Sequence, residues 1–239
     1  MISEMEKAEA FKFFRELELL LNKKIPCPKE VRESVSSIVD DSKNSAMDSH
    51  KNRSKTAFLN HCVVPLLYDF MVSLPDFDEQ KATQAILSES YKNLGRYASG
   101  TPARSRPHPF NMEIGTKPQD AVEQWKQKKV VQSCPNMALR EPSPYRVIIV
   151  GKYFTKGGIG AAETKLAEYI YQAFFYLGLP KLPATPTHPA WNYDYALLLM
   201  YDATDEGSLL NAWQSLDTKV KEGCWEGANI YVMILRGND

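Results

Sequence analysis

Lys152 has the clearest capacity for chemistry in this sequence. It follows the apolar run of residues 147–150, and a proline-rich turn separates that run from an earlier one that begins after Pro135. Two such runs around a turn predict a strand hairpin. A lysine at the end of a strand can position water or stabilise negative charge that develops in a transition state. The alternative is a surface lysine whose stem lies along apolar neighbours while its charge stays in water.

Carboxylates near this lysine would extend its chemistry, because Mg²⁺ prefers hard oxygen ligands and activates the water that it binds. Three glutamates are candidates. Glu113 lies in a short apolar segment, Glu123 lies on an expected helix, and Glu163 lies on the helix expected after Lys152. Each has a structural alternative: Glu123 as a solvated helix residue, and Glu163 as an acid favoured by the helix dipole.

The arrangement of a strand hairpin, a lysine at the end of its second arm and a following helix resembles the core of the PD-(D/E)XK nucleases, the restriction-endonuclease-like superfamily. The family pattern has Pro-Asp on the first arm and an acidic residue two positions before the lysine. Here these positions hold Asn136 and Val150. The resemblance implies a catalytic site of Asn136, Val150 and Lys152, with Mg²⁺ as the cofactor and with Asn136, Glu113 and Glu163 as its ligands if the protein is active.

The two neutral positions predict weak or absent metal binding, since Asn136 offers one carbonyl oxygen and Val150 offers none. The first expectation is therefore a restriction endonuclease-like protein that binds double-stranded DNA with impaired or lost Mg²⁺-dependent phosphodiester cleavage. One alternative is an active Mg²⁺-dependent deoxyribonuclease in which Glu113, Glu123 or Glu163 replaces the missing acids. Another alternative is a non-catalytic protein-interaction module.

A basic segment surrounds the hairpin. Residues 117–156 hold eight basic and three acidic residues, although the whole chain has 29 of each and no net charge. A surface that faces nucleic-acid phosphates has such an excess, and so does an ordinary solvated surface. The candidate nucleic-acid-binding residues are Lys126, Lys128, Lys129, Arg140 and Lys156.

Glycines on either side of Lys152 have open interpretations. Gly151 either lets another segment approach the backbone closely or marks a bulge in the strand. The glycine-rich residues 157–160 predict a flexible entry to the next helix. A phosphate cradle is the alternative there, although the Gly-Lys-Ser/Thr ending of a P-loop is missing.

The elements that must position these residues fall into two regions. Helical periodicity over residues 5–22, 56–73 and 78–97 predicts a helical region at 1–100, with Pro65 marking the first turn or a kink of the second helix. The turn-rich residues 99–109 suggest a boundary, followed by a second domain at 101–239.

The second region alternates between the two periodicities. The expected order is a helix over residues 117–129, the hairpin, a helix over 166–177, a strand over 195–200, a helix over 209–220 and a strand over 230–235. This order predicts an α/β (α+β) fold in which helices flank a central mixed β-sheet. It also agrees with the restriction-endonuclease-like core that the resemblance implies.

Composition sets the expected environment. The 239 residues include four cysteines without a CxxC pair, which predicts neither a zinc site nor a disulfide framework. No apolar signal region opens the sequence, and no apolar run reaches the roughly 18 residues that a membrane helix needs. We therefore expect a cytoplasmic protein without a membrane partner. The resemblance adds a homodimer as an expected form, because dimers are common among proteins of this fold.

Overall fold

The computed structural model describes residues 2–41, 50–88, 137–177, 192–216 and 229–237. The helices and strands of these ranges, in chain order, are α1 (Glu4–Lys24), α2 (Pro28–Asp41), α3 (His50–Phe58), the π-helical turn η1 (Leu59–Val63), α4 (Val64–Val72), α5 (Glu79–Ala85), β1 (Ile86–Ser88), β2 (Met137–Leu139), β3 (Val147–Phe154), α7 (Ile159–Leu177), β4 (Tyr195–Asp202), α8 (Ser208–Ser215) and β5 (Ile230–Leu235).

The strands form one mixed sheet in the order β1-β2-β3-β4-β5. Neighbouring strands are antiparallel from β1 to β3 and parallel from β3 to β5. Every residue of β3 and β4 is buried, which explains why these strands read as continuous apolar runs: both faces of the parallel part are covered. The predicted mixed α/β fold is confirmed.

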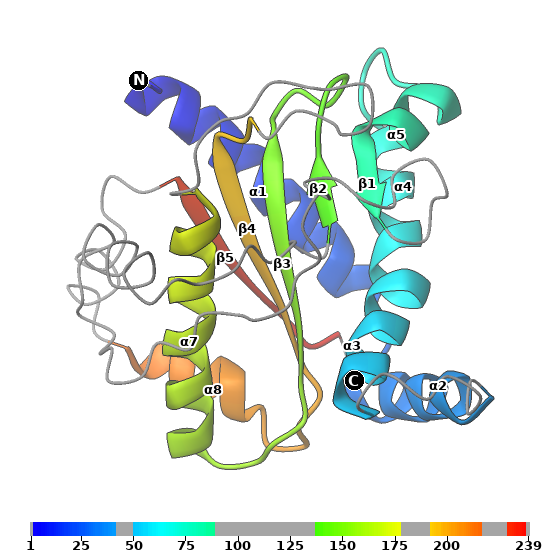
Figure 1. The fold of residues 1–239 in the computed structure, drawn as a ribbon, viewed down its shortest axis with the longest axis vertical. Coiled ribbons are helices and arrows are strands. Elements are labelled where there is room, and N and C mark those ends of the chain that lie inside the picture. Colours follow the sequence, from blue (N-terminus) through cyan, green and yellow to red (C-terminus); the bar gives the residue numbers. More distant parts are fainter. Residues whose placement is uncertain (1, 42–49, 89–136, 178–191, 217–228, 238–239) are drawn as a thin grey trace.

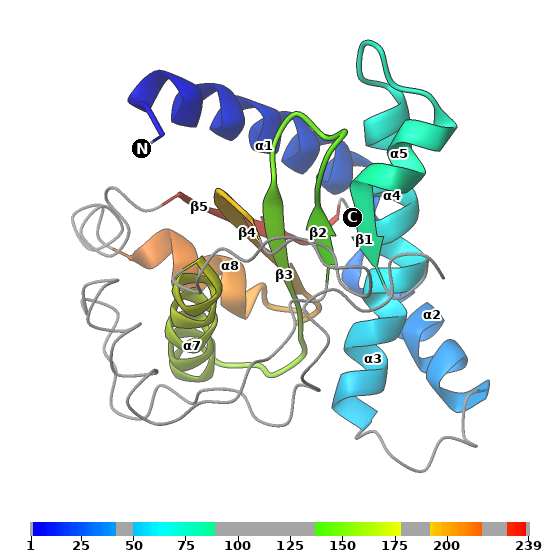
Figure 2. The ribbon, with the colours of Figure 1, turned by 45° about the horizontal axis from the view of Figure 1, so that its top comes forward.

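Helices cover both faces of this sheet (Figure 1; Figure 2). On one face, α1 packs with α3 and α4 against alternate strand residues such as Ile149, Leu197 and Met233. On the other face, α7 and α8 pack against the residues between them, such as Ile148 and Leu198. The helices of the first region thus share an apolar core with the strands of the second. The boundary predicted near residue 100 lies outside the described residues.

The predicted order from the hairpin onward is confirmed: β2, β3, α7, β4, α8 and β5 follow one another as expected. The helix predicted over 117–129 lies outside the described residues. The helix predicted over 78–97 is wrong at Ile86–Ser88, which form β1 and pair with β2, and its residues 89–97 lie outside the described residues. Pairing with a neighbouring strand overrides local helical preference there.

The helix predicted over residues 56–73 is present but interrupted. Its path runs through α3, the π-helical turn η1 and α4. Pro65 lies in the first turn of α4, as predicted, directly after the π-helical turn. The π-helical turn brings Leu59 against the sheet.

Gly151 marks a close approach and not a bulge. The pairing of β3 with β4 runs through Gly151 opposite Leu199 without interruption. A Cβ atom on Gly151 would lie 2.6 Å from Cδ2 of Leu59. Glycine at this position therefore allows η1 to pack directly on the strand.

Candidate functional site at the carboxyl end of strand β3

Strand β3 places Lys152 in the buried layer beneath α7. Only 5% of Lys152 is exposed. Its Nζ donates a 2.5 Å hydrogen bond to Oε1 of Gln172 and lies 4.4 Å from the ring centroid of Tyr169. An amide oxygen and the face of an aromatic ring thus surround the ammonium group, both of which stabilise a cation outside water.

The polar contact of Lys152 continues along α7. Nε2 of Gln172 donates a 3.3 Å hydrogen bond to the hydroxyl of Tyr176, one turn further on. Residues three and four apart lie on one face of a helix, so Tyr169, Gln172 and Tyr176 all face the sheet. Gln172 is 6% exposed and was missed by the sequence reasoning. Gln172 follows Tyr169 by three residues and precedes Tyr176 by four, and this helical spacing on the apolar face of α7 is the signal that could have identified it.

The other predicted catalytic residues divide between the buried layer, the surface and the undescribed ranges. Val150 lies on the same face of β3 as Lys152 and is 1% exposed within an apolar layer. Glu163 lies in the first part of α7 and is exposed. Asn136, Glu113 and Glu123 lie outside the described residues. The structure therefore brings Val150 and Lys152 together and leaves Glu163 in solvent.

A cavity of about 410 Å³ lies at the carboxyl end of β3. Side chains from three helices and from the strand end line it. They include Arg32 and Val35 of α2, Ser54 of α3, Lys156, and Lys165 and Tyr169 of α7. The cavity lies beyond β2, which pairs with residues 147–149 at the opposite end of β3.

Positive charge dominates the described wall of this cavity. It contains Arg32, Lys156 and Lys165, and no carboxylate is among the described residues that line it. Arg32 forms a 2.6 Å ion pair with Asp205, and Lys165 pairs with Glu168 three residues along α7. Lys156 is exposed and forms no ion pair with a described residue. Its charge is the one most available to a ligand.

Tyr153 forms the aromatic side of the cavity. Its ring stacks on Tyr201, with centroids 6.1 Å apart and planes 7° apart, and on Phe58 at 5.4 Å. Burial raises the pKa of Tyr153 to about 12, against a smaller opposing effect from Arg32. The phenol therefore stays neutral at physiological pH and supplies an apolar, rigid surface.

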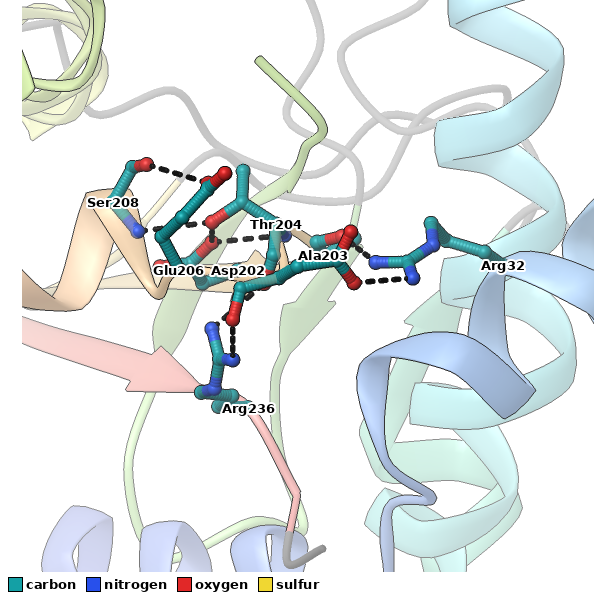
Figure 3. Close-up of polar contacts among 8 residues, drawn as sticks. Arg32, Asp202, Ala203, Thr204, Glu206, Ser208 and Arg236 are labelled. Atoms are coloured by element: carbon teal, nitrogen blue, oxygen red, sulfur yellow. Dashed lines mark hydrogen bonds and ion pairs between the residues drawn. The ribbon is translucent and has the colours of Figure 1, made fainter. Parts of the chain in front are cut away.

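The β4–α8 loop beside the cavity is organised by Asp202, which is fully buried at the end of β4 (Figure 3). One carboxylate oxygen accepts hydrogen bonds from the backbone N–H and the hydroxyl of Thr204. The other accepts from the backbone N–H groups of Leu209 and Leu210 in the first turn of α8. Four donors satisfy the charge, which also lies favourably at the positive end of the helix dipole.

Two arginines hold the same loop from separate elements (Figure 3). Arg32 of α2 donates to the carbonyl of Ala203 at 2.5 Å, in addition to its ion pair with Asp205. Arg236, after β5, donates to the carbonyls of Thr204 and Asp205 at 2.7 and 2.6 Å. Because both guanidinium groups bridge two acceptors, the loop is fixed to α2 and to the end of β5.

The two described members of the predicted nucleic-acid-binding set, Arg140 and Lys156, lie at opposite ends of β3. Lys156 lies at the carboxyl end of β3 and lines the cavity. Arg140 lies next to the other end, where its backbone N–H donates to Ala85 and its Nε donates to the carbonyl of Gln84. Eight strand residues at about 3.3 Å each separate the two cations by roughly 25 Å. Lys126, Lys128 and Lys129 lie outside the described residues.

The described ranges contain no group of three or more histidine, cysteine, aspartate or glutamate side chains placed to hold a metal ion. In the same ranges, no helix has the length and apolar content that crossing a bilayer requires. Comparisons with known proteins found no matching family model, no matching curated protein and no matching solved structure.

Proposed function

We propose that this chain is a restriction-endonuclease-like protein that binds double-stranded DNA without hydrolysing it. The observation that carries the proposal is the buried hydrogen bond from Lys152 to Gln172. A lysine that assists phosphodiester hydrolysis must reach the scissile phosphate or the attacking water. With 5% of its surface exposed and its ammonium group against Tyr169, Lys152 is engaged in the packing of α7 instead.

The neutral neighbours of Lys152 support the loss of cleavage. Val150 lies beside it in an apolar layer and has no oxygen to offer a metal ion. Asn136, at the other family position, carries no charge. Replacing both family acids removes the negative charge that would hold Mg²⁺ next to a phosphate.

Support for DNA binding comes from the cations at the two ends of β3. Arg140 and Lys156, roughly 25 Å apart, could each meet a different phosphate of a duplex, since a duplex presents phosphates along its whole length. Contacts of this kind supply affinity without reading sequence. The excess of basic residues over 117–156 adds to the same tendency.

The test measures retention and cleavage of DNA together. A labelled duplex should bind, and its affinity should fall steeply between about 50 and about 200 mM salt, because phosphate contacts release counterions. Plasmid incubated with the protein and Mg²⁺ should remain intact. Arg140→Ala should weaken retention and lower the salt dependence, whereas Lys12→Ala, on the exposed side of α1, serves as the charge-matched control.

Two outcomes would contradict the proposal and favour one of its alternatives. Nicking that requires Mg²⁺ and is lost in Lys152→Ala would establish the active nuclease with migrated carboxylates. An absence of duplex retention even at low salt would instead favour the protein-interaction module.

A further inference from the structure

We propose that the cavity at the carboxyl end of β3 is a binding site for a phosphate monoester carried on a nucleotide-sized body. The argument depends on the cavity alone and not on duplex binding. It uses two features: the size of the cavity and the distribution of charge and aromatic surface on its wall.

The size of the cavity favours a small organic ligand. Its volume of about 410 Å³ lies within the range of roughly 300–1,000 Å³ that is typical of small-molecule sites. A bare phosphate ion would leave most of this space to water, and a DNA duplex cannot enter it. A ligand of the size of a mononucleotide matches it.

The charge of the wall favours an anion. Arg32, Lys156 and Lys165 lie around one space, and none of the described lining residues is acidic. Three cations suit a dianion better than a monoanion, provided that Arg32 and Lys165 exchange their partially exposed partners Asp205 and Glu168 for the ligand. A phosphate monoester reaches a charge near −2 above its second pKa of about 6, whereas a phosphodiester or a carboxylate stays at −1.

Arg32 can contact the ligand and still keep a hydrogen bond to the β4–α8 loop. The guanidinium of Arg32 has five donors, of which one meets the carbonyl of Ala203 and another meets Asp205. Asp205 is 81% exposed, so its ion pair with Arg32 is in water and is readily exchanged for a phosphate oxygen. The bond to Ala203 would remain and would keep the guanidinium in place.

The remaining wall suits the body of such a ligand. The rings of Tyr153 and Tyr169 and the side chain of Val35 provide apolar surface, and the hydroxyls of Ser54 and Thr155 lie among them. Tyr153 is held rigidly by its stack with Phe58. An aromatic wall next to a cluster of cations is the combination that a flat, phosphorylated molecule requires.

The experiment is titration calorimetry of the full chain with adenosine monophosphate as the probe, against adenosine and inorganic phosphate. Adenosine monophosphate should bind more tightly than either fragment at pH 7.5, and the binding should weaken at pH 5 as the phosphate becomes protonated. Lys156→Ala should weaken it about tenfold or more, since a charge-assisted hydrogen bond contributes about 1.5–3 kcal/mol. Lys12→Ala, remote on α1, should bind as the unaltered protein does.

A second arm distinguishes the two sources of a phosphate monoester. Single strands that differ only in a 5′-phosphate or a 5′-hydroxyl are compared: a preference for the phosphorylated strand means that the site accepts strand ends, and equal weak binding with retained nucleotide binding means that it takes free nucleotides. Either result supports the proposal.

Three results would overturn it. They are equal affinity for adenosine and its monophosphate, unchanged affinity in Lys156→Ala, and no heat with the monophosphate from a protein whose circular dichroism shows it folded. Arg140→Ala distinguishes a failure of this proposal from a failure of duplex binding. Because Arg140 lies at the opposite end of β3, this substitution should weaken duplex binding and leave the affinity for adenosine monophosphate unchanged.

Discussion

The carboxylate of Asp202 accepts a 2.8 Å hydrogen bond from the backbone N–H of Leu209, and this contact joins the end of β4 to the start of α8. Leu209 follows Asp202 by seven residues, and the carbonyls of Ala203, Thr204 and Asp205 between them accept hydrogen bonds from Arg32 and Arg236. The loop, at the carboxyl end of β4, is joined to the cationic cavity by Arg32, which lines the cavity and bonds to Ala203 and Asp205.

Asp202→Asn should destabilise the protein strongly. The amide has about the same shape, but it loses the charge and turns an NH₂ group toward backbone donors. Leaving buried donors unsatisfied costs about 1–3 kcal/mol each, so a loss of roughly 2–4 kcal/mol in the free energy of unfolding is expected. Urea denaturation measures it. Asp69→Asn, at an exposed site, should change stability by less than about 0.5 kcal/mol, and equal effects of the two substitutions would contradict the structural role of Asp202.

Lys152 and Gln172 should be energetically coupled. Lys152→Met and Gln172→Met each remove one partner of a buried hydrogen bond and leave the other residue without that bond, so each should destabilise the fold. The double variant replaces both by apolar groups and should be less destabilised than the sum of the single variants, by about 1–3 kcal/mol. A urea-denaturation cycle gives the coupling energy. Strict additivity would mean that Lys152 does not depend on Gln172, as expected of a lysine kept available for catalysis.

The order of strands and helices from β2 to β5 could be predicted because each element has a strong local period. The buried run of β4 and the amphipathic pattern of α7 are examples. The strand β1 could not be predicted, because Ile86–Ser88 becomes a strand only through pairing with Met137–Leu139, about fifty residues away. Local sequence contains no information on that partner.

The candidate site was predicted only in part for the same reason. Lys152 lies on β3 and Lys156 lies two residues after its end, so their proximity follows from the sequence. Arg32 bonds to Ala203 and Asp205, which lie more than 170 residues later in the sequence, and no local pattern relates them. The environment of Lys152 could not be predicted from the sequence either, because whether this lysine is exposed or buried depends on how α7 covers β3.

Gly151→Ala and Gly160→Ala should have opposite effects. A Cβ atom at Gly151 would lie 2.6 Å from Leu59, which is itself buried, so the packing of η1 on β3 must shift at a cost of about 1–3 kcal/mol. At Gly160, in the first turn of α7, nothing lies within 4 Å, and alanine should stabilise the helix by up to about 1 kcal/mol. Thermal unfolding of the two variants measures both signs. An unchanged melting temperature for Gly151→Ala would show that η1 does not pack closely on the strand.

The stability of the protein should fall in alkaline solution through Tyr153. Burial raises the pKa of this tyrosine to about 12, whereas an unfolded tyrosine ionises near pH 10. The native state therefore holds its proton longer, and stability is lost as pH rises from about 10 to about 12. Tyr153→Phe should flatten this loss in urea denaturation curves measured at several pH values. Tyr201→Phe should also lower stability at neutral pH, because its hydroxyl donates to the carbonyls of Pro26 and Arg236. Parallel alkaline curves for the unaltered protein and Tyr153→Phe would show that the Tyr153 phenol is not buried against Phe58 and Tyr201.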